Sequence, residues 1–106
     1  MADISSVTRR KVKIRRAPKY CNIFYNNDVT SFDVVIALLT KIFNKSLADG
    51  MLIANAIHKQ GKGIVLISSK EVCETKEDLV SQAKEALGPM ARELKTTVEV
   101  YDEQED

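Results

Sequence analysis

The sequence of 106 residues contains no apolar run of about 18 residues and no apolar stretch near its N-terminus. Neither a membrane-spanning helix nor a signal peptide is therefore predicted, and we expect a cytoplasmic protein. The two cysteines, Cys21 and Cys73, are too few and too far apart for a paired-cysteine zinc or redox motif. We expect both to be buried, reduced thiols.

Sequence motifs of the common enzyme classes are also missing. The chain has no glycine-rich nucleotide-binding loop and no nucleophile motif of the hydrolases. Cys73 and the sole histidine, His58, are accompanied by no residue pattern that would orient them for catalysis. We therefore expect no enzymatic activity, no cofactor and no metal site.

The formal net charge of +1 hides an uneven distribution. Residues 1–19 contain seven cations and one anion, and residues 99–106 contain five acids and no base. The stretch 20–98 between them has nine charges of each sign. The length fits one domain, so we expect a flexible basic arm over 1–18, a neutral domain over 19–101 and an acidic tail over 102–106.

Three segments are rich in β-forming residues and are predicted to be strands. They cover residues 19–25, 63–67 and 96–101. The second is an uninterrupted apolar run, so we expect it to be the central strand of a small sheet.

Three helices are predicted between these strands from apolar spacing and capping residues. The first is capped by Thr30 or Ser31 and ends near residue 44, the second runs from a cap at Ser46 to Gly61, and the third follows a cap at Thr75. The inner face of the second helix is expected to contain Leu47, Met51, Ala54 and Ile57. The prediction is an α+β fold of order β-α-α-β-α-β, in which a three-stranded antiparallel sheet packs against three helices.

A polar turn and the histidine suggest a binding site for a peptide N-terminus. A free α-amino group is mostly cationic at pH 7 and has three N–H donors, so its capture needs converging oxygens beside an apolar hole. His58 ends the second helix and can face the turn. Taken singly, such a turn is more often ordinary turn chemistry, and a sole histidine on an apolar helix face is more often a core residue. The turn offers oxygens from Asn26, Asn27, Asp28 and Thr30.

Four segments, in this order, resemble motifs of the ClpS family, whose members bind proteins by destabilising N-terminal residues and pass them to a Clp AAA+ unfoldase and its peptidase. The expected fold is also similar to the C-terminal domain of the ribosomal stalk protein, which lacks the turn and the histidine. The four segments are Tyr25-Asn26-Asn27-Asp28-Val29-Thr30, Ala56-Ile57-His58-Lys59-Gln60-Gly61-Lys62, Glu71-Val72-Cys73-Glu74-Thr75-Lys76 and Leu94-Lys95-Thr96-Thr97-Val98-Glu99.

The resemblance implies a role for individual residues. The ligand's α-amino group would be bound by Asn26, Asn27 and His58, while Asp28 and Thr30 would shape the turn. The pocket for the first side chain would be lined by Phe32, Val35, Ala54, Ile57 and Leu94. Glu71 and Lys76, expected to flank a strand-to-helix junction where both are exposed, would dock on the N-terminal domain of the unfoldase.

Two positions depart from the family pattern. Asn27 stands where the family has an aspartate that pairs with the ligand's ammonium, and Asn keeps an acceptor oxygen but lacks the charge. Because charged hydrogen bonds are worth more than neutral ones, affinity is expected to fall about tenfold or more. Phe32 stands where the family commonly has methionine, and its rigid ring is less adaptable than a thioether.

Three functions remain open on the sequence. The first is a monomeric adaptor that recognises bulky hydrophobic N-terminal residues and delivers the proteins to the unfoldase. In this reading the basic arm occupies the place of the family's N-terminal extension and engages the unfoldase during delivery. The second is a modulator that docks on the unfoldase with weakened N-terminal recognition and alters its substrate choice. The third is nucleic-acid binding by the basic residues 9–16 through counterion release.

Overall fold

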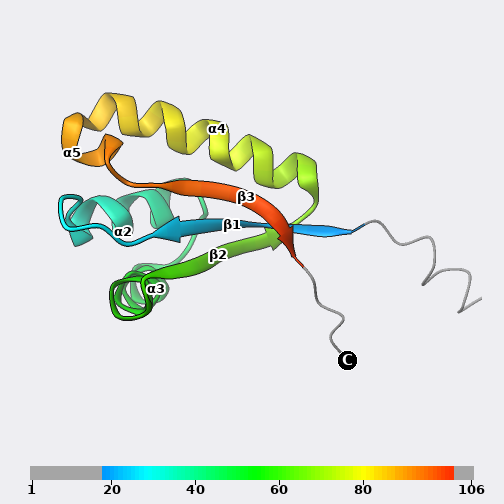
Figure 1. Ribbon diagram of the computed structural model, residues 1–106, viewed down its shortest axis with the longest axis horizontal. Coiled ribbons are helices and arrows are strands. Elements are labelled where there is room, and N and C mark those ends of the chain that lie inside the picture. Colours follow the sequence, from blue (N-terminus) through cyan, green and yellow to red (C-terminus); the bar gives the residue numbers. More distant parts are fainter. Residues whose placement is uncertain (1–17, 102–106) are drawn as a thin grey trace, which may run out of the picture.

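The computed structural model describes residues 18–101, and the predicted order of elements is confirmed (Figure 1). Three strands, β1 (Lys19–Tyr25), β2 (Lys62–Ser68) and β3 (Thr96–Tyr101), form one antiparallel sheet. Their spatial order is β2-β1-β3. The prediction that residues 63–67 form the central strand is therefore wrong, because β1 takes that place and β2 is an edge.

The burial of the two strands explains this difference. β1 is buried over four consecutive residues, Cys21–Phe24, whereas Ile64 and Ile67 of β2 are 45% and 42% exposed. The pairing register shifts between Asn22 and Ile23, so that Val65 is left without a partner in β1. Such a bulge changes which side chains share a face. An apolar run therefore indicated the strand but not its position in the sheet.

Four helices complete the fold: α2 (Phe32–Lys41), α3 (Leu47–Gln60), α4 (Lys70–Leu87) and the short α5 (Pro89–Arg92). The hydroxyl groups that cap the three long helices belong to Ser31, Ser46 and Ser69, and each accepts a backbone N–H three residues later. α2 ends at Lys41, three residues earlier than expected, and Asn44 then adopts a left-handed conformation with φ 57°. The helix α5 overlaps residues 90–95, whose sequence pattern is ambiguous.

The start of α4 differs from the prediction. The helix begins after Ser69, six residues before the expected cap at Thr75. Thr75 lies inside the helix, and its hydroxyl donates to the carbonyl oxygen of Glu71 at 2.9 Å. The buried face of α4 is formed by Cys73 and Val80, seven residues apart. A cysteine occupies the first buried position, so the stripe begins about two turns before Val80.

The inner face of α3 was also predicted wrongly at two positions. Ala54 and Ile57 are buried as expected, but Leu47 and Met51 are 64% and 53% exposed. Gly50 takes the inner position instead, and a β-carbon built there would lie 3.5 Å from Cγ2 of Thr40. Such a contact is an ordinary one, so Gly50 is buried without being required by the packing, and choosing the stripe by side-chain size misses such a residue.

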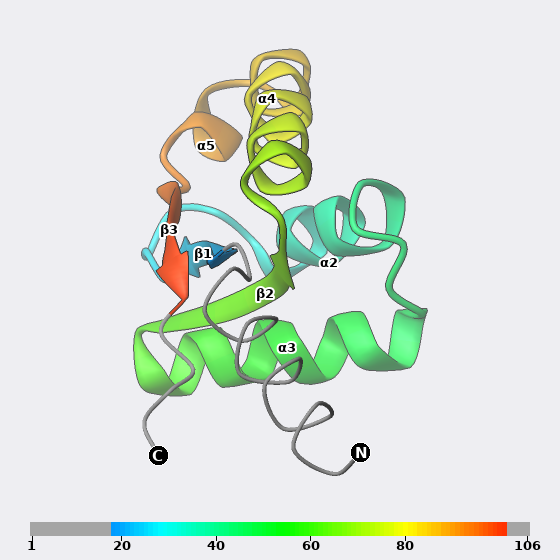
Figure 2. The same cartoon turned by 90° about the vertical axis from the view of Figure 1, so that its right-hand side faces the viewer.

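The core joins the sheet to the three long helices. Phe24 from β1 packs with Leu39 of α2, Ala54 of α3 and Val80 of α4. Figure 2 shows α2 lying between α3 and α4. Within the described part of the chain, no helix is both long and apolar enough to span a membrane.

Candidate functional site

The polar turn after β1 is held in place by backbone hydrogen bonds to two distant segments. The amide of Tyr25 donates to the carbonyl of Lys95 at 3.0 Å, and the amide of Asn26 donates to the carbonyl of Gly61 at 2.9 Å. Gly61 ends α3 in a left-handed conformation with φ 94°, which favours glycine. The turn therefore lies beside the end of α3 and the segment before β3.

Asn27 organises the turn through its side chain. Its Oδ1 accepts hydrogen bonds from the amides of Val29 at 2.8 Å and Thr30 at 2.7 Å, and its Nδ2 donates to Oγ1 of Thr30 at 3.2 Å. The Thr30 hydroxyl in turn donates to the carbonyl of Met90 at 2.7 Å. The Asn27 oxygen thus accepts two N–H groups, which fills its two lone pairs.

Three of the other predicted polar residues are exposed. The side chains of Asn26, Asp28 and His58 make no hydrogen bond within residues 18–101. The ring of His58 packs edge-on against Phe32, with centroids 5.6 Å apart and an angle of 76° between the planes. His58 is therefore exposed and in contact with the first residue of α2, rather than enclosed in the core.

A small cavity lies between the turn, α2, α3 and the segment before β3. Its volume is about 20 Å³, which is room for about one water molecule. All five residues expected to form the side-chain pocket line it. The lining consists of Tyr25, Asn26, Asn27, Thr30, Phe32, Val35, Ala54, Ile57 and Leu94.

The walls of this cavity differ in exposure. Val35, Ala54, Ile57 and Leu94 are all buried, whereas Phe32 is 42% exposed. Phe32 is therefore the most exposed of these five side chains.

Tyr25 lines the cavity although sequence reasoning gave it no role. The ammonium of Lys95 lies 4.8 Å from the centroid of the Tyr25 ring, and the Tyr25 hydroxyl donates to Oε2 of Glu99 at 3.1 Å. The sequence feature that could have identified Tyr25 is its position as the last residue of β1, directly before Asn26.

Glu71 and Lys76 both lie within α4, so they do not flank a strand-to-helix junction as expected. Glu71 is exposed in the first turn of the helix. Lys76 is half-buried, and its Nζ donates to the carbonyl oxygen of Ile42 at 2.8 Å. Lys76 therefore holds α4 to the end of α2, and its ammonium is only partly available to a partner.

Both cysteines are buried and free. Burial raises the pKa of each thiol, and the carboxylate of Glu99 adds to this effect for Cys21.

No group of three metal-ligating side chains occurs within residues 18–101. The basic residues 9–16, most of the 1–18 arm and the 102–106 tail lie outside the described residues.

Comparison with known proteins places this site in a family context. Residues 15–97 match the family described as ATP-dependent Clp protease adaptor protein ClpS. The chain is 40% identical over 100 residues to the ATP-dependent Clp protease adapter protein ClpS of Desulforapulum autotrophicum, covering 92% of each chain. It is 32% identical to the protein of the same name from Lawsonia intracellularis, covering 86% of this chain and 81% of the relative.

A solved structure shares the fold. ClpS2 of Agrobacterium tumefaciens, determined bound to L-phenylalaninamide, superposes with a TM-score of 0.73 and 23% sequence identity. The match covers 81% of this chain and all of that one. On the sequence matches, this chain belongs to the ClpS family of ATP-dependent Clp protease adaptor proteins.

Proposed function

We propose that this chain binds proteins by a bulky hydrophobic N-terminal residue and delivers them to a Clp AAA+ unfoldase, without catalysing a reaction itself. The observation that carries this proposal is the convergence of the five predicted pocket residues on one cavity beside the polar turn. The solved relative was bound to L-phenylalaninamide, which has an aromatic side chain next to a free α-amine. A protein that begins with phenylalanine presents the same two groups.

In this function the α-amino group is bound at the rim of the cavity. Asn26 lines the cavity and its side-chain oxygen is not used by another described residue. The imidazole of His58, when neutral, supplies a second acceptor beside Phe32. Asn27 contributes by holding the turn, because its oxygen already accepts two amides. The ligand's side chain enters the cavity as the ring of Phe32 moves aside.

Peptide titration tests amine capture. Peptides beginning with Leu, Phe, Tyr or Trp are titrated by fluorescence anisotropy in parallel with their N-acetylated forms. Acetylation removes the charge and two of the three N–H donors, so we expect affinity to fall at least tenfold. Equal affinities for the free and acetylated peptides would show that amine capture is wrong.

A second candidate, a modulator with weakened recognition, is favoured by one observation. Asn27 has no charge to offer an ammonium, and its oxygen is fully engaged in the turn. Asn27→Asp keeps the acceptor for Val29 and Thr30 and adds the charge, while losing the bond from Nδ2 to Thr30. A large gain from a negligible starting affinity would support the modulator. Measurable binding by the unaltered chain, with only a moderate change in the variant, would support the adaptor.

Docking on the unfoldase is assigned to the start of α4. Glu71 is exposed there and is free to contact a partner. Lys76 lies about one and a half turns further along the same helix, and its ammonium donates to the carbonyl oxygen of Ile42. We infer that Glu71 makes the exposed contact and that Lys76 both contacts the partner and fixes α4 on α2.

A further inference from the structure

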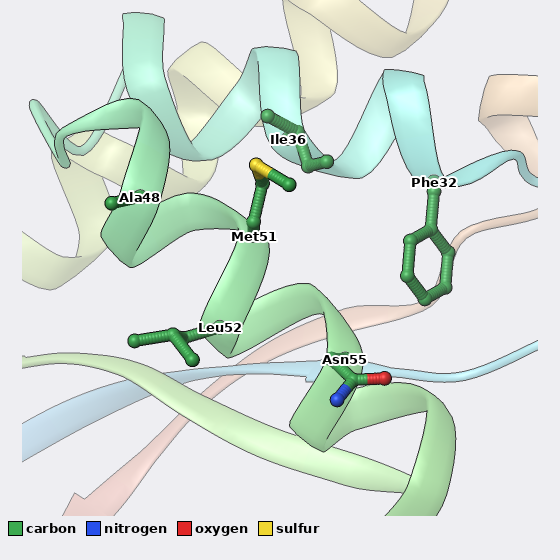
Figure 3. A pocket seen from close by; sticks show the side chains of 6 residues that line it. All are labelled: Phe32, Ile36, Ala48, Met51, Leu52 and Asn55. Carbon is green, nitrogen blue, oxygen red and sulfur yellow. The ribbon is translucent and has the colours of Figure 1, made fainter.

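A second, larger hollow lies on the other side of Phe32, between α2 and α3 (Figure 3). Its volume is about 570 Å³, and five of its six lining residues are apolar. We call it the α2–α3 groove. It is lined by Phe32, Ile36, Ala48, Met51, Leu52 and Asn55.

The groove contains apolar side chains that lie outside the core and are largely exposed. Leu52 is 68% exposed, and its neighbour Met51 also faces solvent rather than the core. Neither residue lines the small cavity, so the proposed capture of the first residue does not account for them. Contiguous exposed apolar surface on a small domain commonly marks a binding site.

Phe32 connects the groove to the cavity, because it lines both. A substrate whose first side chain passes this ring meets the groove as the next apolar surface. From Asn55 to Ala48 the groove follows seven residues of α3, which is about 10 Å of helix. An extended peptide advances about 3.3 Å per residue, so the groove is about three residues long.

We propose that the α2–α3 groove binds an apolar side chain of the substrate at its third residue. In an extended peptide, side chains one and three point to the same side, and the second points away. With the first side chain in the cavity, the third therefore faces Met51 and Leu52. This proposal rests on the proposed function, and it adds a second specificity position to it.

The test compares three peptides that begin with Phe and differ at the next two positions: Phe-Ser-Ser, Phe-Ser-Leu and Phe-Leu-Ser, each followed by the same polar sequence. Partial burial of one leucine is expected to tighten binding of Phe-Ser-Leu about fivefold over Phe-Ser-Ser. Leu52→Gln should abolish this gain and leave the affinity for Phe-Ser-Ser unchanged. Leu87→Gln, which changes a 52% exposed leucine on α4, is the matched control and should keep the gain.

Several outcomes would overturn the proposal. Equal affinities for the three peptides, a gain from leucine at the second position alone, or a gain that survives in Leu52→Gln would each do so. A dimer in sedimentation velocity that Leu52→Gln abolishes, with no change in peptide affinity, would assign the groove to a second copy instead. The N-acetylated form of Phe-Ser-Ser separates the two proposals, because its equal binding contradicts amine capture itself.

Discussion

Asn27 is the residue on which the geometry of the turn depends most. Its carboxamide satisfies the amides of Val29 and Thr30 and orients the Thr30 hydroxyl that reaches Met90. Asn27→Ala removes all three side-chain bonds, so we expect it to lower the free energy of unfolding by about 1–2 kcal/mol. Urea denaturation measures the change.

The matched control for this prediction is Asn26→Ala, one position earlier. The Asn26 side chain makes no hydrogen bond within residues 18–101, so its loss should change stability by no more than about 0.5 kcal/mol. The same variant should weaken the binding of peptides with a free α-amine. Equal destabilisation by the two substitutions would contradict the role given to Asn27.

At the residue scale, the sequence predicted most of the residues that line the cavity, but it did not predict the separate roles of the residues around it. Phe32, Val35, Ala54, Ile57 and Leu94 were placed by resemblance and converge in space. The engagement of the Asn27 oxygen depends on the conformation of the three residues that follow, which composition does not specify. The small volume of the cavity depends on how its nine lining residues pack, which spacing along a helix leaves open.

The packing of α3 on its neighbours predicts opposite effects for two glycines. A β-carbon at Gly50 would make ordinary contacts of 3.5 and 3.6 Å with Thr40 and Ile36, whereas one at Gly63 would lie 2.9 Å from Cγ1 of buried Ile57. Gly50→Ala should raise the free energy of unfolding by about 0.5–1 kcal/mol through helix propensity. Gly63→Ala should lower it by about 1–2 kcal/mol. Thermal unfolding of both variants tests the pair, and a loss of stability in Gly50→Ala would contradict the ordinary contacts expected for a β-carbon at that position.

The position at which α4 begins makes a second prediction for an element. Ser69→Ala removes the hydroxyl that accepts the amide of Val72, so it should cost about 1 kcal/mol of stability. Thr75→Ala should cost less than about 0.5 kcal/mol, because Thr75 lies inside the helix and alanine has the higher helix propensity. Chemical denaturation of the two variants compares them. A larger loss of stability in Thr75→Ala than in Ser69→Ala would instead support the helix cap at Thr75 that the sequence predicted.

Elements were predictable where one local rule decides the structure. β1 and β3 were expected at their observed bounds, because β1 is rich in β-forming residues and ends at a polar turn, and β3 alternates and is rich in β-branched residues. The place of β2 at the edge depends instead on pairing with β1, and the start of α4 depends on burying Cys73. Both features depend on contacts between elements, and the sequence of a single segment does not show those contacts.

For the molecule as a whole, the proposed functions use different surfaces. Peptide capture is proposed for the turn and the α2–α3 side, and docking is proposed for the start of α4. Glu71→Ala should therefore weaken binding to the N-terminal domain of a Clp unfoldase several-fold while leaving peptide affinity and melting temperature unchanged. Glu74→Ala, an exposed acid on the same helix, is the control in a pull-down or titration.

Lys76→Ala provides a contrast within the same docking experiment. It removes the bond to the carbonyl of Ile42, so it should lower the melting temperature as well as unfoldase affinity. Loss of unfoldase binding in Glu74→Ala equal to that in Glu71→Ala would show that helix charge, rather than the Glu71 position, governs docking.

The distribution of charge along the chain leads to the last prediction. The neutral domain has the cavity and the docking residues, while residues 9–16 of the basic arm contain six cations. If the arm acts in delivery, deleting residues 1–17 should leave the affinities for peptides and for the unfoldase's N-terminal domain unchanged, because it removes no residue of either proposed surface. Degradation of a substrate beginning with phenylalanine by the complete Clp protease should slow markedly, because a tethered segment acts at high effective concentration.

A second variant separates the length of the arm from its charge. Replacing the six cations of residues 9–16 by glutamine keeps the tether and removes the polyanion-binding chemistry. Degradation that persists in this variant but not in the deletion would assign delivery to the tether. Unimpaired degradation in the deletion would contradict a delivery role. Nucleic-acid binding that is steeply salt-dependent and lost in both variants would instead assign the arm to phosphate contacts, since each neutralised phosphate releases counterions.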